Sequence, residues 1–175
     1  MELLRTLQNE TGGFTEFVPL SFVHQESPLF VTGTVLGVQP GPCGNDVIRL
    51  YAISRLMLGA SMTNIQASWV KEGLRHSQWL LSCGVNDLGG TLINESISTT
   101  AGAQHGQLVT PAAIRRLIRD AGRTPLQRST TYEVLKKFPQ DLSIEEEVQE
   151  AAHEPLNRVN KNSKLFGSYQ ELVSN

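Results

Sequence analysis

The sequence has 175 residues, of which 39% are apolar and 18% are charged, and its formal net charge is −2. This composition excludes a mostly disordered chain, and the small net charge argues against nonspecific binding to nucleic acid or to a membrane. The two cysteines, Cys43 and Cys83, are too few for a disulfide framework, a structural zinc site or an iron–sulfur cluster. No long apolar run and no signal peptide is recognisable, so we expect a cytoplasmic protein, with an organelle as the alternative.

Charge is distributed unevenly along the chain. Residues 1–138 carry 12 basic and 10 acidic side chains, whereas residues 139–175 carry 3 basic and 7 acidic ones. The change coincides with Pro139, a residue that breaks helices. We therefore expect a folded body over residues 1–138 and an acidic helical extension with a disordered end over residues 139–175.

Helical and extended segments alternate along the first part of the body. Residues 2–8 place leucines on one side and predict a helix that the following two glycines end. Residues 14–20 are rich in aromatic and β-branched side chains and predict a buried strand. Residues 28–44 contain many prolines and glycines and predict a long loop. Residues 46–58 predict a helix that packs on a sheet.

The second strand and the second helix follow directly. Residues 64–70 predict a strand in which Gln66, Ser68 and Val70 share one face. Residues 71–83 predict a single helix that ends at the next glycine.

The remaining elements continue the same alternation. Residues 87–93 predict a third strand, and the small polar residues 94–108 predict another exposed loop. A helix begins after Thr110, which is a suitable N-cap followed by proline. Residues 125–132 predict a final strand or an extended crossing, and residues 143–146 form a capping box that opens a short acidic helix.

The order of strand and helix, repeated three times, predicts an α/β fold with a parallel sheet covered by helices. Three strands are few for a parallel sheet, because its strands are normally buried on both faces. They would also leave two open edges, which invite pairing with further chain. We therefore expect either that further strands come from the tail region or that this chain is part of something larger.

Polar side chains gather at the carboxyl ends of the predicted strands, where βα folds bind their ligands. The candidate substrate-binding residues are Glu16, His24, Gln66, Ser68, Asn86, Asp87, Thr91, Asn94, Glu95 and His105. Several carry hydrogen-bonding groups on short side chains. Such a set fits recognition of a polar small molecule that is rich in heteroatoms.

Several of these residues also have a purely structural interpretation. Glu16 could cap a neighbouring helix or pair with an arginine, and Asp87 could only shape a turn. Glu95 and His105 could be solvated loop residues. We expect His76, in the middle of a helix among polar residues, to lie on the surface.

Common catalytic motifs are missing from the sequence. It contains no GxSxG elbow with a plausible triad, no Walker loop, no dinucleotide-binding fingerprint, and no HExxH or CxxC motif. An arginine-rich stretch could form a phosphate-binding patch, but an exposed helix face is the favoured interpretation. These arginines are Arg115, Arg116, Arg119 and Arg123.

Three long motifs identify a resemblance. GGFTEFVPLSFVHQESPLF (12–30), NIQASWVKEG (64–73) and NDLGGTLINESISTTAGAQHGQ (86–107) resemble the C-terminal part of the FO synthase family. They resemble most closely its second subunit, the CofH-type tyrosine 4-hydroxyphenyl transferase. GRTPLQRSTTY (122–132) resembles the stretch that follows in that family, so the likeness covers about residues 1–135.

The resemblance implies a radical S-adenosylmethionine enzyme on a (βα) barrel, of which this chain holds the closing strands. A [4Fe–4S] cluster and S-adenosylmethionine are the implied cofactors. The implied substrates are tyrosine, which loses its 4-hydroxybenzyl fragment, and 5-amino-6-(D-ribitylamino)uracil, which receives it in the synthesis of the deazaflavin FO. The ten candidate residues fall where substrate contacts are expected, with no individual roles assigned.

The sequence departs from the family in one respect: the CxxxCxxC motif that binds the cluster is absent, and Cys43 and Cys83 do not match it. We therefore expect activity only together with a cluster-bearing half, supplied in the same polypeptide or by a separate chain. Two alternatives stay open. The chain is a fragment without catalytic function, or it is a homologue from the futalosine-dependent menaquinone pathway.

Overall fold

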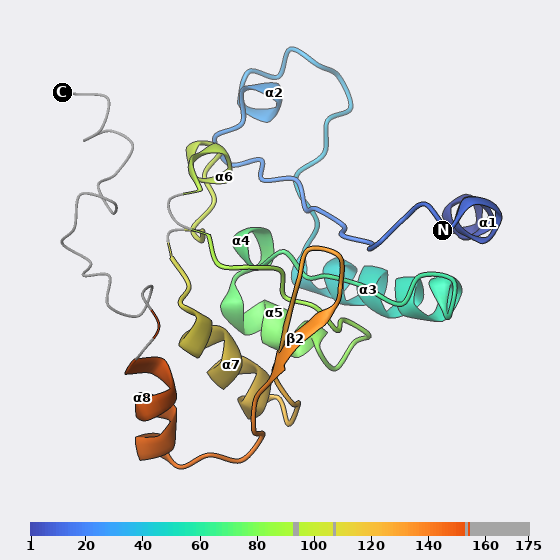
Figure 1. Cartoon of the computed structure of the whole chain (residues 1–175). Helices are drawn as coiled ribbons and strands as arrows, with labels where there is room; N and C mark the ends of the chain where they lie inside the picture. The colour runs from blue at the N-terminus through green and yellow to red at the C-terminus, as the bar shows by residue number, and fades with distance from the viewer. Residues whose placement is uncertain (93–94, 107, 153, 155–175) are drawn as a thin grey trace.

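The computed structural model describes residues 1–92, 95–106, 108–152 and 154. Within these ranges the chain forms a mostly helical fold with one small two-stranded sheet (Figure 1). The elements are α1 (Glu2–Thr11), α2 (Pro28–Val31), α3 (Gly44–Leu58), α4 (Trp69–Glu72), α5 (Leu74–Leu80), α6 (Ser96–Thr100), α7 (Pro111–Asp120), β1 (Leu126–Arg128), β2 (Val134–Lys137) and α8 (Ile144–Ala152).

The three predicted strands occur as three short parallel segments rather than as a regular sheet. Phe17 forms a parallel bridge with Ile65, and Gln66 forms another with Asp87. The Gln66 amide donates to the Phe17 carbonyl at 3.0 Å, and the Ala67 amide donates to the Asp87 carbonyl at 2.9 Å. The segments keep the predicted parallel order, but each is much shorter than predicted.

Local backbone features shorten the first and third segments. The strand predicted over residues 14–20 reaches Pro19, which has no amide hydrogen to donate to a ladder. The strand predicted over residues 87–93 turns at Gly89, whose φ is 71°. A glycine adopts such a conformation at little cost, and it takes the chain out of the extended region.

The second segment is ended by a helix. The strand predicted over residues 64–70 is wrong at its C-terminal end, because α4 begins at Trp69 with Ser68 as its N-cap. Helical geometry replaces the alternation of a strand at this point. Ser68 and Val70 therefore do not share a strand face with Gln66.

The three segments have two chemically different faces. Phe17 and Ile65 pack into the hydrophobic core, which they share with residues of α3, α5 and α7. Glu16, Gln66 and Asp87 lie on the opposite face, because side chains alternate along extended chain. We call these three residues the polar face. The buried residues of the core include Val47, Tyr51, Leu58, Ala67, Leu80 and Leu88.

The prediction of a single helix over residues 71–83 is wrong, because Gly73 separates two helices, α4 and α5. Gly73 has a φ of 76°, which side-chain-bearing residues rarely adopt. A Cβ atom at this position would lie 2.6 Å from Nε2 of His105. The glycine thus permits both the change of direction and the close approach of the histidine ring.

Four helices follow their sequence signals. Thr110 caps α7 by accepting from the Ala113 amide at 3.2 Å, and α1 ends at Gly12, whose φ is 59°. The capping box of α8 is confirmed: the Ser143 amide donates to Glu146 at 2.8 Å, and the Glu146 amide donates back to Ser143 at 3.3 Å. α3 includes the whole of the predicted helix. Such caps are local, so the sequence alone reveals them.

Two short helices lie inside segments predicted as loops. α2 begins at Pro28 within the predicted loop 28–44. α6 lies within the predicted loop 94–108, and its Glu95 side chain accepts from the Ser98 amide at 2.8 Å. Both helices are too short to display a helical period in the sequence.

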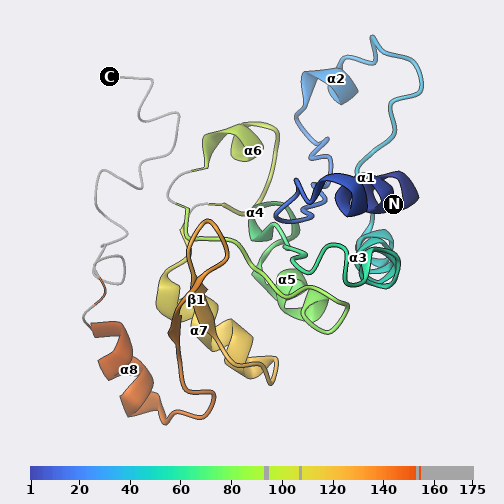
Figure 2. The same ribbon diagram turned by 45° about the vertical axis from the view of Figure 1, so that its right-hand side comes forward.

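Residues 125–132, predicted as a strand or an extended crossing, form the first arm of a hairpin. β1 pairs with β2 in antiparallel register, and the Phe138 amide closes the base by donating to the Pro125 carbonyl at 3.0 Å. Tyr132 lies in the connecting turn with a φ of 66°. We call residues 125–138 the hairpin, which lies beside α7 in Figure 2.

The sequence suggested that the arginines of α7 form an exposed helix face, but two of them are buried. Figures 1 and 2 place α8 beside α7, and the Arg115 and Arg119 side chains are only 6% exposed because carboxylates of α8 cover them. Arg116 stays exposed and also reaches α8, with Nη1 2.7 Å from Glu147. The acidic segment is thus the partner of these arginines.

Over the described residues, every helix is too short or too polar to cross a lipid bilayer.

Candidate functional site

The polar face brings together three of the candidate residues from separate parts of the sequence. Glu16 comes from the first parallel segment, Gln66 from the second and Asp87 from the third. The Asp87 side chain is 8% exposed and that of Glu16 is 34% exposed. Two carboxylates and one amide therefore point to the same side of the molecule, away from the core.

Arg128 from the hairpin connects these three residues. Its Nη2 lies 3.2 Å from Asp87 Oδ1 and donates to Gln66 Oε1 at 3.2 Å, and its Nε also donates to Asp87. Glu16 Oε2 lies 3.8 Å from the same guanidinium. The hydrogen bonds to Asp87 raise the pKa of Arg128, and this effect outweighs the lowering by burial. The guanidinium therefore carries its charge at every physiological pH.

Tyr132 completes the cluster from the turn of the hairpin. Its hydroxyl donates to Glu16, and its ring lies against the Arg128 guanidinium, whose central carbon is 4.0 Å from the ring centroid. Burial, and next the hydrogen bond to Glu16, raise the pKa of the Tyr132 phenol. The phenol thus stays protonated and acts as a hydrogen-bond donor.

Sequence reasoning missed Arg128 and Tyr132. Both stand in the QRSTTY stretch, where a cation and an aromatic residue interrupt an otherwise small and polar segment. That composition was the available signal. Their role depends on the hairpin folding back over the polar face, which no local pattern predicts.

A second group of candidates lines a separate pocket of about 240 Å³. His24 accepts from the Gly41 amide through Nδ1 at 2.9 Å. His105 lies against Gly73 on another wall of the pocket. His24 and His105 thus line one pocket, whereas neither belongs to the cluster around Arg128.

His76, expected on the surface, also lines this pocket. Its Nδ1 lies 3.6 Å from Glu72 Oε2, and the Glu72 side chain is only 5% exposed. Ser21 donates to the other oxygen of Glu72 at 2.5 Å. The His76 side chain is still 24% exposed, so it lies at the surface of the molecule while it lines this pocket.

The other candidates have structural partners. Asn86 Oδ1 accepts from the Ile65 amide and from Arg55, each at 2.9 Å, and so ties two parallel segments together. Glu95 caps α6 and Ser68 stands at the N-terminus of α4. Thr91 is half-buried beyond the turn after Asp87. Asn94 lies outside the described residues.

The cysteines do not fit the [4Fe–4S] cluster that the sequence resemblance implies. Cys43 is exposed at the N-terminus of α3, where its thiol lies 3.0 Å from Asp46. Cys83 is half-buried and packs against the core. The part of the chain that the structure describes contains no group of three or more residues suited to a metal ion. We therefore assign no cluster chemistry to these residues.

The cluster around Arg128 is suited to recognition by hydrogen bonding. Arg128 and Tyr132 are the donors of the bonds within the cluster, and Glu16, Gln66 and Asp87 are the acceptors. None of these groups is an activated nucleophile. The arrangement can orient a polar ligand on the face opposite the core.

Comparisons with known proteins match most of the chain. The profile for the CofH/MqnC C-terminal region matches residues 11–142. A protein of Methanopyrus kandleri named 5-amino-6-(D-ribitylamino)uracil–L-tyrosine 4-hydroxyphenyl transferase is 49% identical over 138 residues, which are 79% of this chain and 37% of that protein. A protein of the same name from Methanothermobacter thermautotrophicus is 50% identical over 132 residues, 75% of this chain and 35% of that protein.

The FO synthase of Mycobacterium tuberculosis is 47% identical over 135 residues, which are 77% of this chain but only 15% of that enzyme. The chain thus spans little more than a third of the transferases and a smaller part of the synthase. The profile match covers most of the chain and includes every residue of the polar face, together with Arg128 and Tyr132. The chain belongs to the CofH/MqnC C-terminal region family.

Proposed function

We propose that this chain is the C-terminal segment of an FO synthase of the CofH type. In that role it helps to transfer the 4-hydroxybenzyl fragment of tyrosine to 5-amino-6-(D-ribitylamino)uracil during synthesis of the deazaflavin FO. The names and the high identity of the relatives support the reaction. The observation that carries the proposal is the polar face, which gathers hydrogen-bonding groups from three parallel segments.

The fold that we propose for the complete enzyme is a (βα) barrel. Residues 1–138 supply its C-terminal part, and residues 139–175 are an acidic extension. In such a barrel the helices cover the outside, and the opposite face of the strands points inward. Phe17 and Ile65 face the helices here, so Glu16, Gln66 and Asp87 would face the interior.

The polar face suits the proposed substrates. Tyrosine carries an ammonium and a carboxylate group, and the aminouracil carries ring amides and a ribityl chain of hydroxyls. Arg128 and Asp87 offer a charged donor and a charged acceptor on one surface, and Gln66 offers an amide beside them. We propose that these residues orient a substrate, and that His24 and His105 contribute further substrate contacts from their separate pocket.

The proposal needs a cluster-bearing half, because this chain lacks the cysteines for a [4Fe–4S] cluster. That half would bind the cluster and S-adenosylmethionine, either in the same polypeptide or as a separate chain. The contribution of the residues described here is then to bind and orient substrate, to complete the barrel and to exclude water.

Co-expression with the N-terminal part of a related tyrosine transferase tests the proposal. We expect a stable complex that forms the coupled product from tyrosine and 5-amino-6-(D-ribitylamino)uracil, detected by mass spectrometry. A complex that forms but yields no product would support a fragment without catalytic function. Turnover of a futalosine-type substrate in place of tyrosine and the aminouracil would support the menaquinone-pathway alternative.

A further inference from the structure

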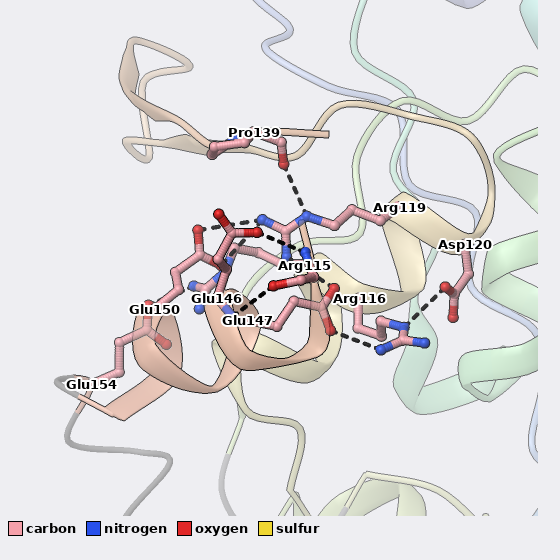
Figure 3. Close-up of polar contacts among 10 residues, drawn as sticks. Arg115, Arg116, Arg119, Asp120, Pro139, Glu146, Glu147, Glu150 and Glu154 are labelled. Atoms are coloured by element: carbon pink, nitrogen blue, oxygen red, sulfur yellow. Dashed lines mark hydrogen bonds and ion pairs between the residues drawn. The ribbon is translucent and has the colours of Figure 1, made fainter. Parts of the chain in front are cut away.

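The helix α8 lies beyond residues 11–142, the part that the family profile matches. It nevertheless makes a dense set of ion pairs with α7 (Figure 3). Its apolar side chains Ile144 and Val148 are exposed, so carboxylates rather than apolar contacts hold it in place. Ion pairs of this kind would stabilise the elements that the arginines of α7 also contact.

Arg119 joins α8 to the end of the hairpin. Its Nη2 lies 3.1 Å from Glu150 Oε2, and its Nε donates to the Pro139 carbonyl at 2.9 Å (Figure 3). The side chain is almost completely buried. One guanidinium therefore bonds α8 on one side and the chain directly after β2 on the other.

Arg115 also connects α8 with the base of the hairpin. Its Nε lies 2.7 Å from Glu150 and its Nη1 lies 2.5 Å from Glu154. Its guanidinium covers the ring of Phe138, 4.6 Å from the centroid. Phe138 is buried and closes the base of the hairpin through its bond to Pro125.

The hairpin in turn carries Arg128 and Tyr132 to the polar face, where they bond Asp87 and Glu16. A continuous series of contacts thus runs from α8 through α7 and the base of the hairpin to the candidate site. A buried guanidinium that loses its carboxylate partners strongly destabilises the folded state around it. Release of α8 would therefore disturb the contacts that Arg115 and Arg119 make with the hairpin.

We propose that α8 is a clasp that fixes the hairpin over the polar face, with Arg115 and Arg119 as the residues that transmit its effect. Arg115 and Arg119 are positioning residues, because they act on the site through Arg128 and Tyr132. The proposal concerns the arrangement of this chain and holds whatever reaction the complete enzyme performs.

Hydrogen exchange on the full chain tests the clasp. The variant Glu147→Gln/Glu150→Gln removes two carboxylates that hold Arg115, Arg116 and Arg119. We expect the amides of residues 126–137 to exchange at least about tenfold faster, while those of α3 change little, because the hairpin opens locally. The control is Glu145→Gln, which neutralises one carboxylate at an exposed position of α8 and is compared with the single variants Glu147→Gln and Glu150→Gln as well as with the double variant.

A second readout separates positioning from general stability. The NMR signal of the Arg128 Nε–H should lose its protection in the double variant and keep it in Glu145→Gln. The variant Glu147→Gln/Glu150→Asp should keep part of the protection that Glu147→Gln/Glu150→Gln loses, because aspartate retains the charge at position 150. Unchanged exchange in the hairpin, or equal acceleration in the hairpin and in α3, would overturn the proposal. Because both readouts are structural, their failure would leave the proposed reaction untouched.

Discussion

Arg128 and Asp87 are 41 residues apart in the sequence, and the Arg128 guanidinium donates hydrogen bonds to the Asp87 carboxylate from two nitrogen atoms. Asp87 belongs to a parallel segment and Arg128 to the hairpin. This pair is therefore the point where the hairpin is anchored on the polar face. Its loss should affect both stability and ligand recognition.

Replacing Arg128 by methionine should leave the buried Asp87 carboxylate without its partner. We expect the free energy of unfolding to fall by about 2 kcal/mol, the usual cost of a buried charged group left unsatisfied. Urea denaturation measures it. The control is Arg75→Met, at an exposed arginine, which should change stability by less than about 0.5 kcal/mol. Equal effects of the two changes would contradict the anchoring role.

Replacing Tyr132 by phenylalanine should alter the alkaline behaviour of the chain. The folded state raises the pKa of this phenol above its ordinary value of about 10. Tyrosine then ionises more readily in the unfolded chain, so stability present below pH 10 is lost as the pH rises further. Tyr51, whose pKa burial also raises, contributes in the same direction.

We therefore expect the free energy of unfolding of the wild type to fall as the pH rises above about 10, and to fall less steeply in Tyr132→Phe. Urea denaturation at a series of pH values measures the slope. The change Tyr51→Phe provides a comparison at a second tyrosine with a raised pKa. An identical slope in wild type and Tyr132→Phe would contradict a pKa of Tyr132 that burial and the hydrogen bond to Glu16 raise in the folded state.

Replacing Gly73 by alanine should strain the junction between α4 and α5. The position has a positive φ, and a Cβ there would collide with the ring of His105. We expect a loss of about 1–2 kcal/mol in the free energy of unfolding from the backbone alone. Gly90→Ala is the control, since nothing lies within 4 Å of a Cβ at that position and its φ is not positive. Similar stability of both variants would show that the junction is not constrained.

The sequence predicted those elements whose signals are local. Thr110 before Pro111 marks the start of α7, and Ser143 with Glu146 marks the start of α8. The strands were predicted too long, because Pro19 and the helix at Trp69 limit them. Backbone pairing depends on neighbours distant in sequence, so the lengths of short parallel segments are poorly encoded locally.

The candidate site was predicted in part for the same reason. Glu16, Gln66 and Asp87 were candidates because polar side chains were expected at the carboxyl ends of the predicted strands. Arg128 was missed because its importance arises only when the hairpin folds onto the polar face. The arginines of α7 were misinterpreted because their partners lie on α8, about 30 residues further along the chain.

The most direct test of the account compares Asp87→Asn with Asp120→Asn in a complex with a cluster-bearing half. Asp120 lies on α7 and pairs only with the exposed Arg116 among the described residues. If the polar face binds substrate, product formation from tyrosine and 5-amino-6-(D-ribitylamino)uracil should fall by about a hundredfold in Asp87→Asn, typical for the loss of a group that orients substrate. Product formation should stay near wild type in Asp120→Asn. Equal activity of both variants in an intact complex would contradict the claim that the polar face binds substrate.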